Sequence, residues 1–161
     1  MTDTGLLREI EEFLFDEVEL IDDGNLEAWV ALFTPDGEYW VPSEPDQVDP
    51  HGTASIIHEG VRVLEVRARR LRHERVIANV IPVRARHLLG NVRVREVESS
   101  SGPYRVTANF VMLEYRADRQ RVFGGKYDYR LQRVDGAFRI ERKRVDLLTC
   151  DAPHGALLLP F

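Results

Sequence analysis

The strongest constraint on this chain is a run of three consecutive strand patterns in its last third. The middle pattern, Arg121 to Val134, alternates apolar and polar side chains with a period of two. Each kind keeps to one parity, with Phe123, Tyr127, Tyr129 and Leu131 on the first and Lys126, Asp128, Arg130 and Gln132 on the second. This alternation is typical of a half-buried antiparallel strand. We therefore expect a sheet with one face packed on the core.

The two strands predicted on either side depart from this simple pattern. Tyr104 to Arg116 is apolar on both parities, so we expect it to have a packing partner on each face. Its second apolar parity consists of Val111, Leu113 and Tyr115. Ala137 to Leu148 changes its apolar parity near Arg142 to Arg144, which predicts a β-bulge or a change of packing environment at that point.

Helical periodicity dominates the first part of the chain. From Leu6 to Ile21 the apolar residues recur with the spacing of an amphipathic helix. Asn25 is a candidate N-cap for a second short helix, whose buried stripe would be Leu26, Trp29, Val30 and Phe33. A third helix is predicted from His58 to Arg72. Two helices would therefore meet at a tight corner and a third would follow.

The remaining segments complete a mixed fold. A short strand, Glu38 to Val41, precedes a loop from Ser43 to Gly52, and another strand runs from Arg84 to Val97. On that strand we expect Leu88, Val92 and Val94 on one face, and His87, Leu89, Asn91, Arg93 and Arg95 on the other. The order predicts one α+β domain over residues 1–161. Its curved, mixed and mostly antiparallel sheet would wrap around the N-terminal helices.

Charge and composition limit the partners. Residues 1–60 hold sixteen acids against one base, whereas residues 61–161 hold twenty-one bases against eleven acids. We expect the acidic part to cover the basic part in the folded chain, and so no nucleic acid partner. Nothing approaches a membrane span or a signal peptide, and the single cysteine, Cys150, excludes an intramolecular disulfide. We expect a soluble, cytoplasmic protein without a membrane partner.

The chain lacks the residues of the common redox and metal sites. A Rieske cluster needs two cysteines and two histidines, which one cysteine cannot supply. The five histidines, at 51, 58, 73, 87 and 154, include no helical i, i+4 pair and no i, i+2 pair on a strand. We therefore expect no metal, no cofactor and no catalytic residue in this chain. Gly124 and Gly125 lie inside a strand pattern and predict a bend or a close backbone approach.

A pocket inside the curved sheet remains an alternative. An apolar pocket can raise the pKa of a carboxyl group and set it against a tyrosine or histidine. The polar candidates for such a pocket are Asp22, Tyr39, His87, Tyr127 and Asp128. They would serve a stand-alone dehydratase or isomerase, or a module that binds a small hydrophobic ligand.

Three stretches in order carry a family resemblance. They are Glu12 to Trp40, Arg84 to Val94 (RARHLLGNVRV) and Val122 to Pro153. Through them the chain resembles the β (small) subunit of bacterial aromatic-ring-hydroxylating dioxygenases. That family is built on the cone-like fold shared with scytalone dehydratase and nuclear transport factor 2.

The resemblance implies a structural subunit in the breakdown of aromatic compounds. Its partner would be a large α subunit that carries the Rieske [2Fe–2S] cluster and the mononuclear iron, commonly as an α3β3 hexamer with contacts between the β subunits. Electrons from NADH would arrive through separate reductase components. On this reading the candidate interface is the arginine-lined face and the second apolar parity, namely Arg93, Arg95, Val111, Leu113 and Tyr115.

Overall fold

A computed structural model describes residues 4–72 and 81–161. Within these residues the chain forms three helices and six strands. In chain order they are α1 (Thr4–Asp22), α2 (Leu26–Val30), β1 (Phe33–Pro42), β2 (Ser55–Gly60), α3 (Val61–Leu71), β3 (Arg84–Val97), β4 (Tyr104–Arg116), β5 (Arg119–Val134) and β6 (Ala137–Leu147).

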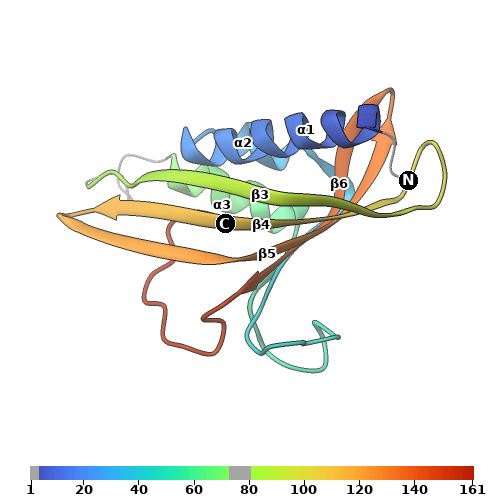
Figure 1. The fold of residues 1–161 in the computed structure, drawn as a ribbon. Helices are drawn as coiled ribbons and strands as arrows, with labels where there is room; N and C mark the ends of the chain where they lie inside the picture. Colours follow the sequence, from blue (N-terminus) through green and yellow to red (C-terminus); the bar gives the residue numbers. More distant parts are fainter. Residues whose placement is uncertain (1–3, 73–80) are drawn as a thin grey trace.

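All six strands belong to one sheet in the order β2-β1-β6-β5-β4-β3. Every neighbouring pair is antiparallel except β1 and β6, which run parallel. The sheet curves, α1 lies along β3, and the helices cover one face (Figure 1). We call this the inner face and the opposite one the outer face. The observed fold confirms the expected α+β class with a mixed, mostly antiparallel sheet.

The N-terminal corner largely follows its sequence pattern. The predicted apolar stripe of α1 is buried at Ile10, Leu14, Val18 and Ile21. The Asn25 side chain caps α2 by accepting a hydrogen bond from the Ala28 backbone N–H at 3.4 Å. The expected extension of this helix to Phe33 is wrong, because Phe33 already pairs with Ile140 at the start of β1. Pairing with β6 therefore takes precedence over the helical pattern.

The predicted third helix is partly a strand. Residues 58–60 belong to β2, where His58 lies opposite Trp40 of β1, and α3 begins only at Val61. Residues 58–60 form a strand because the edge of β1 offers unpaired backbone groups, and this segment supplies their hydrogen-bond partners. The sequence pattern did not reveal β2 because its short apolar run also fits a helix.

Two bulges decide which side chains face inward. The parity change expected near Arg142 is confirmed, since the β5–β6 register shifts at Glu141 and turns Lys143 to the inner face. The parity expected for β3 is wrong beyond Gly90. Asn91 takes a positive φ of 54° and interrupts the register with β4. Val92 therefore packs against the core together with Leu89.

Aromatic rings fill the space between the helices and the sheet. Tyr127 stacks on Phe110 with ring centroids 4.2 Å apart and an angle of 2°. Phe161 also lies inside, 5.0 Å from the Phe123 ring, and its backbone N–H donates to the Tyr39 hydroxyl at 2.9 Å. The interior of the cone is thus packed with side chains at these positions rather than open.

Candidate subunit interface and buried polar centre

The five predicted interface residues all lie on the outer face, in two separate regions. Val111 and Leu113 are exposed on β4, and Tyr115 follows them on the same parity. Arg93 and Arg95 lie on β3 beyond its bulge, beside the other end of β4. Because of the bulge, the two arginines share a face with Val111. His87 and Leu89, which were expected beside them, lie on the opposite face.

The first region is an apolar strip that crosses three strands. Leu88 of β3 lies opposite Val111, and Leu113 lies opposite Val122 of β5. The Leu148 backbone N–H donates at 2.9 Å to the carbonyl of Gly124, which lies opposite Val111. We call these five residues the outer strip: Leu88, Val111, Leu113, Val122 and Leu148. Their exposed fractions run from 38% at Leu113 to 82% at Leu148. Contiguous exposed apolar side chains of this kind are typical of interaction surfaces.

The second region is charged and holds several ion pairs. The Arg105 guanidinium contacts the Asp128 carboxylate at 2.8 Å, and Arg130 contacts Glu141 at 2.9 Å. Arg95 donates to the Thr107 hydroxyl at 2.9 Å. Arg93 is exposed and makes no side-chain hydrogen bond or ion pair with any residue in the described ranges. Asp128, expected on the polar parity, is therefore a surface ion-pair partner.

The loop between β1 and β2 borders the outer strip. Gln47 is buried in this loop and holds it together, accepting from the Ser43 backbone N–H and donating to the carbonyls of Asp49 and Thr53. A groove of about 650 Å³ separates the loop from β4 to β6, with Val111 and Leu148 in its lining. The loop thus extends the outer face beyond the sheet.

Four of the five polar candidates for the alternative pocket, all but Asp128, lie on the opposite side of the sheet. Asp22, at the end of α1, binds His87 of β3 through both carboxylate oxygens. One oxygen lies 2.6 Å from Nδ1 and the other accepts the His87 backbone N–H at 2.8 Å. The His87 side chain is 0% exposed. The structure therefore unites two of the predicted residues in a specific contact.

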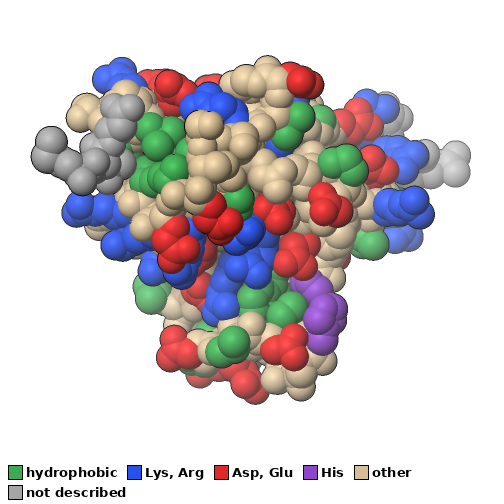
Figure 2. Space-filling model, turned by 90° about the vertical axis from the view of Figure 1, so that its right-hand side faces the viewer, with side chains coloured by type: hydrophobic (Ala, Val, Ile, Leu, Met, Phe, Trp, Pro, Cys, Tyr) green, Lys and Arg blue, Asp and Glu red, His purple; other side chains and the backbone are tan. Residues whose placement is uncertain are grey.

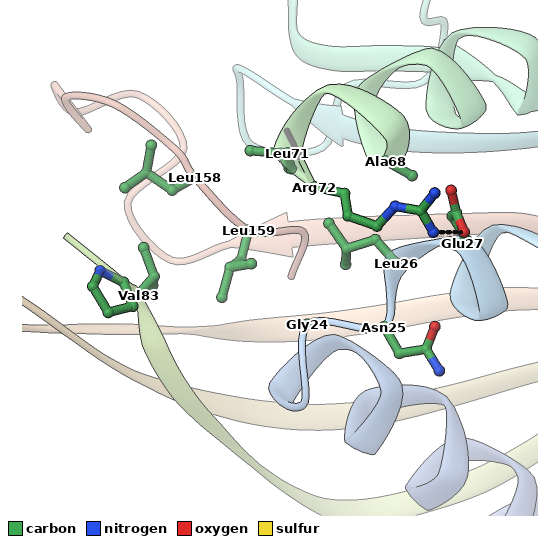
Figure 3. A pocket seen from close by; sticks show the side chains of 11 residues that line it. Gly24, Asn25, Leu26, Glu27, Ala68, Leu71, Arg72, Val83, Leu158 and Leu159 are labelled. Carbon is green, nitrogen blue, oxygen red and sulfur yellow. Dashed lines mark hydrogen bonds and ion pairs between the residues drawn. The ribbon is translucent and has the colours of Figure 1, made fainter. Parts of the chain in front are cut away.

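Tyr39 and Tyr127 lie deeper in the same interior. Both side chains are fully buried, and burial raises the pKa of each phenol well above its ordinary value of 10. A groove of about 460 Å³ opens elsewhere, between α2, α3 and the segment before β3 (Figure 3). Its wall includes Leu26, Leu71 and Leu159 but none of the four pocket residues. The two phenols and the His87 imidazole are enclosed, whereas Asp22 borders two surface grooves, of about 320 Å³ and 530 Å³.

The most highly connected buried group went unnoticed in the sequence. The Glu17 carboxylate on α1 accepts from the Trp29 indole at 2.6 Å, the Lys143 ammonium at 2.7 Å and the Tyr129 hydroxyl at 2.9 Å. Glu17 and Lys143 are both 0% exposed. Lys143 also lies 4.4 Å above the centre of the Tyr127 ring. This buried polar centre joins α1 and α2 to β5 and β6.

A signal for this centre was available in the periodicities. Glu17 lies three residues after Leu14 and four before Ile21, inside the apolar stripe of α1. Lys143 has the same parity as Val145 and Leu147 after the bulge of β6. A charged residue on the buried side of two separate elements predicts an ion pair between them, because an isolated charge is rarely buried.

The part of the chain that the structure describes is mixed in surface charge (Figure 2) and contains neither a metal-binding cluster nor a membrane-spanning helix. Acidic and basic side chains lie side by side on the face drawn in Figure 2. Within residues 4–72 and 81–161, no group of three or more histidine, cysteine or acidic side chains converges as a metal site would require. No helix in these ranges is long and apolar enough to span a bilayer.

Comparison with known proteins identifies the family. The profile of the family described as ring hydroxylating beta subunit matches residues 16–153. The small oxygenase component of the p-cumate 2,3-dioxygenase system of Pseudomonas putida is 36% identical over 155 residues, which cover 91% of this chain and 82% of that protein.

Solved structures agree with this match. The crystal structure of the beta subunit of benzoate 1,2-dioxygenase from Burkholderia mallei superposes with a TM-score of 0.77. It is 26% identical, with 96% of this chain and 97% of that chain covered. A Novosphingobium aromaticivorans protein described as a scytalone dehydratase shares the fold, with a TM-score of 0.68 at 19% identity. The predicted resemblance is therefore confirmed, and the chain belongs to the family of ring hydroxylating beta subunits.

Proposed function

We propose that this chain is the β subunit of a multicomponent aromatic-ring-hydroxylating dioxygenase, and that it acts in assembly during the breakdown of aromatic compounds. The observation that carries the proposal is the family match, which extends over residues 16–153. We infer that residues 1–161 form one cone-shaped domain, because one hydrophobic cluster contains residues of helices and of the sheet. The family relationship also favours a cytoplasmic location.

The partner in this proposal is a large α subunit. It would hold the Rieske [2Fe–2S] cluster and the mononuclear iron, and receive NADH electrons through separate reductase components. A Rieske cluster does not fit the donor set of this chain, whose single cysteine, Cys150, is buried. We further propose an α3β3 hexamer in which the β subunits also contact one another. Closed symmetric assemblies of this kind are the usual outcome for soluble oligomers.

We place the subunit contacts on the outer face. The helices already cover the inner face, whereas the outer strip exposes Leu88, Val111, Leu113, Val122 and Leu148 next to the loop held by Gln47. Burial of apolar surface supplies the free energy of association, and a charged rim fixes orientation. The outer strip and the charged region with Arg93 and Arg95 match these two roles.

A stand-alone enzyme is less well supported. Its candidate dyad, Asp22 and His87, is hydrogen-bonded, yet the imidazole and the Tyr127 phenol are fully enclosed by protein. The Tyr127 ring stacks on Phe110, and the Phe110 and Phe161 rings lie 6.4 Å apart, so aromatic side chains fill the interior beside the phenol. Assembly is therefore the function that the geometry favours.

Co-expression tests this proposal. The chain would be produced together with a large α subunit of a ring-hydroxylating dioxygenase, and the product measured by light scattering and iron analysis. We expect a hetero-hexamer whose iron stays with the large chain when the two are separated. A large chain that is fully assembled and active without this protein would contradict the proposal.

The same system tests the outer strip. The double substitution Val111→Asp/Leu113→Asp places two carboxylates in the strip and should prevent co-purification. The matched control is Val63→Asp/Val66→Asp on α3, since both valines are about half exposed on the helical side. Co-purification of the strip variant at the wild-type ratio would rule out this placement, provided that circular dichroism shows both variants to be folded.

A further inference from the structure

Residues 153–161, which we call the closing segment, enter the interior without joining a helix or the sheet. Within the described chain, no backbone group of this segment exchanges a hydrogen bond with another backbone group. Even so, Leu157 and Leu159 pack against the core, and Phe161 is 1% exposed. Contacts that involve side chains therefore hold the closing segment in place.

Arg121 of β5 is the main polar anchor of the closing segment. Its guanidinium donates to the carbonyls of His154 and Ala156, each at 2.9 Å. Its Nε also donates at 2.7 Å to the carboxylate of Glu114, a buried residue of β4. The carboxylate thus orients the planar guanidinium, whose fixed fork of donors then holds two carbonyls of the segment.

The Phe161 side chain occupies an aromatic site. Its ring lies 5.0 Å from the Phe123 ring at an angle of 64°, and 6.4 Å from the Phe110 ring. Its backbone N–H donates to the Tyr39 hydroxyl at 2.9 Å. Edge-to-face contacts of this kind stabilise any benzene ring, whether or not it is part of the chain. Because the side chain is a benzyl group, the free molecule of the same shape is toluene.

A surface groove comes close to this aromatic site. Leu158 and Leu159 of the closing segment line the groove of about 460 Å³ between α2, α3 and the segment before β3 (Figure 3). Phe161 follows Leu159 by two residues, a separation that spans at most about 7 Å of extended chain. Displacement of the segment would therefore connect the groove with the space that the Phe161 ring fills.

We propose that the closing segment is a displaceable plug, and that the space filled by the Phe161 ring binds a small neutral aromatic molecule of the size of toluene. The ligand would take the place of the ring against Phe123 and Phe110. It is neutral because an ionised group would lose its hydration among aromatic side chains. A segment without backbone pairing opens at a lower free energy than a sheet does. The inference goes beyond the assembly role and does not rest on it.

Hydrogen exchange of the full wild-type chain, followed by nuclear magnetic resonance, tests the displacement. The Phe161 amide should be protected about a hundredfold less than the amide of Tyr127 in β5, and its exchange should not depend on urea below the unfolding transition. Near-saturating toluene should accelerate the exchange of Phe161 and not that of Tyr127, because it binds the displaced form. Equal protection of the two amides, or no effect of toluene on Phe161, would overturn the proposal.

Matched substitutions test the aromatic site. Phe161→Ala removes the ring and should bind toluene about tenfold more tightly than wild type, because an apolar cavity takes up a molecule of this kind. Phe138→Ala is the control, since it removes another buried ring, on β6, beside Tyr104. Calorimetric titration compares the two variants. Equal toluene affinities would indicate a general cavity and refute the site. If either variant does not fold, the wild-type exchange decides the question.

The anchor is tested separately. Arg121→Lys keeps a positive charge beside Glu114 but loses the fork of donors, and should raise the exchange rate of the Phe161 amide about tenfold. Arg119→Lys, at the exposed start of the same strand, is the control. Exchange of Phe161 that changes in neither variant, or equally in both, would contradict the plug.

Discussion

At the residue scale, Glu17 and Lys143 form the contact on which the interior depends most. The charges attract each other without competing water, and Trp29 and Tyr129 complete the hydrogen bonds of the carboxylate. Such a pair costs desolvation when it is buried, but removing one partner leaves a buried charge alone. The consequence can be measured with single and double substitutions.

Lys143→Met should lower the free energy of unfolding by about 3–5 kcal/mol, because the buried Glu17 carboxyl group would lose its ammonium partner. The double variant Glu17→Gln/Lys143→Met should recover part of this loss. Urea denaturation followed by tryptophan fluorescence provides the measurement. The control is Arg8→Ala, which breaks the exposed Arg8–Glu12 pair and should cost at most about 1 kcal/mol. Equal effects of Lys143→Met and Arg8→Ala would contradict the assigned role.

Alkaline pH should destabilise the fold. The pKa values of Tyr39, Tyr127 and Tyr129 are raised by burial, so above the ordinary value of 10 the unfolded chain loses protons that the folded chain keeps. Stability is therefore fully present below pH 10 and falls as the pH rises beyond it. Burial lowers the pKa of Lys143, so the titration of this one group opposes the loss of stability. The three phenols outnumber it.

Thermal unfolding between pH 8 and 11.5 checks this expectation. The midpoint should fall above pH 10, and Tyr127→Phe should reduce the steepness of that fall because one of the three phenols is absent. A flat profile up to pH 11.5 would show that these phenols do not control alkaline stability.

At the element scale, β5 and β6 approach each other more closely than a side chain would permit. A Cβ atom on Gly125 would lie 2.0 Å from the Asp146 carbonyl oxygen. The close backbone approach predicted for Gly124 and Gly125 is confirmed at Gly125 alone, since a Cβ on Gly124 would meet its nearest neighbour at 3.5 Å. The two adjacent glycines therefore provide a matched pair of positions at which an alanine substitution can be compared.

Gly125→Ala should destabilise the protein by about 3 kcal/mol or more, since the clash is with backbone that cannot move without breaking the β5–β6 pairing. Gly124→Ala is the matched control and should remain within about 1 kcal/mol of wild type. Thermal unfolding of the two variants distinguishes them. A Gly125→Ala variant as stable as Gly124→Ala would show that β5 and β6 can separate at this point.

The elements also show how far sequence reasoning reaches. Long periodic segments, such as α1 and β5, follow their patterns closely because one face of each is buried throughout. β2 was missed because its six residues become a strand only through pairing with β1. The faces of β3 were exchanged beyond Gly90 because Asn91, in a left-handed conformation, interrupts the register with β4, and a second register shift follows between Val94 and Glu96.

The candidate sites follow the same logic. Val111 and Leu113 were predicted on a second apolar parity, and their exposure on the outer face agrees with that pattern. The contact between Asp22 and His87 joins residues 65 positions apart, and nothing in local periodicity specifies such a pairing. The Glu17–Lys143 centre was missed because both residues look like ordinary surface charges until their faces are assigned.

At the scale of the whole molecule, the charged region of the outer face leads to a further expectation. Arg93 makes no ion pair within the described parts of the chain, and Arg95 makes one hydrogen bond, to Thr107. Arg93→Glu/Arg95→Glu should therefore leave the isolated fold intact and weaken assembly with the α subunit at least tenfold. Rim charges of this kind act chiefly on association, and more so at low salt.

Light scattering over a dilution series, at two ionic strengths, provides the test. Arg62→Glu on the exposed side of α3 is the control charge reversal. Assembly of the double variant that matches this control at both salt concentrations would remove Arg93 and Arg95 from the interface and leave the outer strip as the sole candidate.

The parallel pairing of β1 with β6 has a consequence for how the protein forms in the cell. It joins Phe33 to Ile140, and the Glu17–Lys143 bond spans 126 positions. Contacts this distant in sequence form slowly, and during translation the first helices leave the ribosome long before β6 exists. α1 must therefore wait with its apolar stripe and Glu17 uncovered, and apolar surface that stays exposed in this way favours aggregation until β6 has been made. A partner subunit that binds the complete sheet would therefore bind only chains in which β6 has already been synthesised.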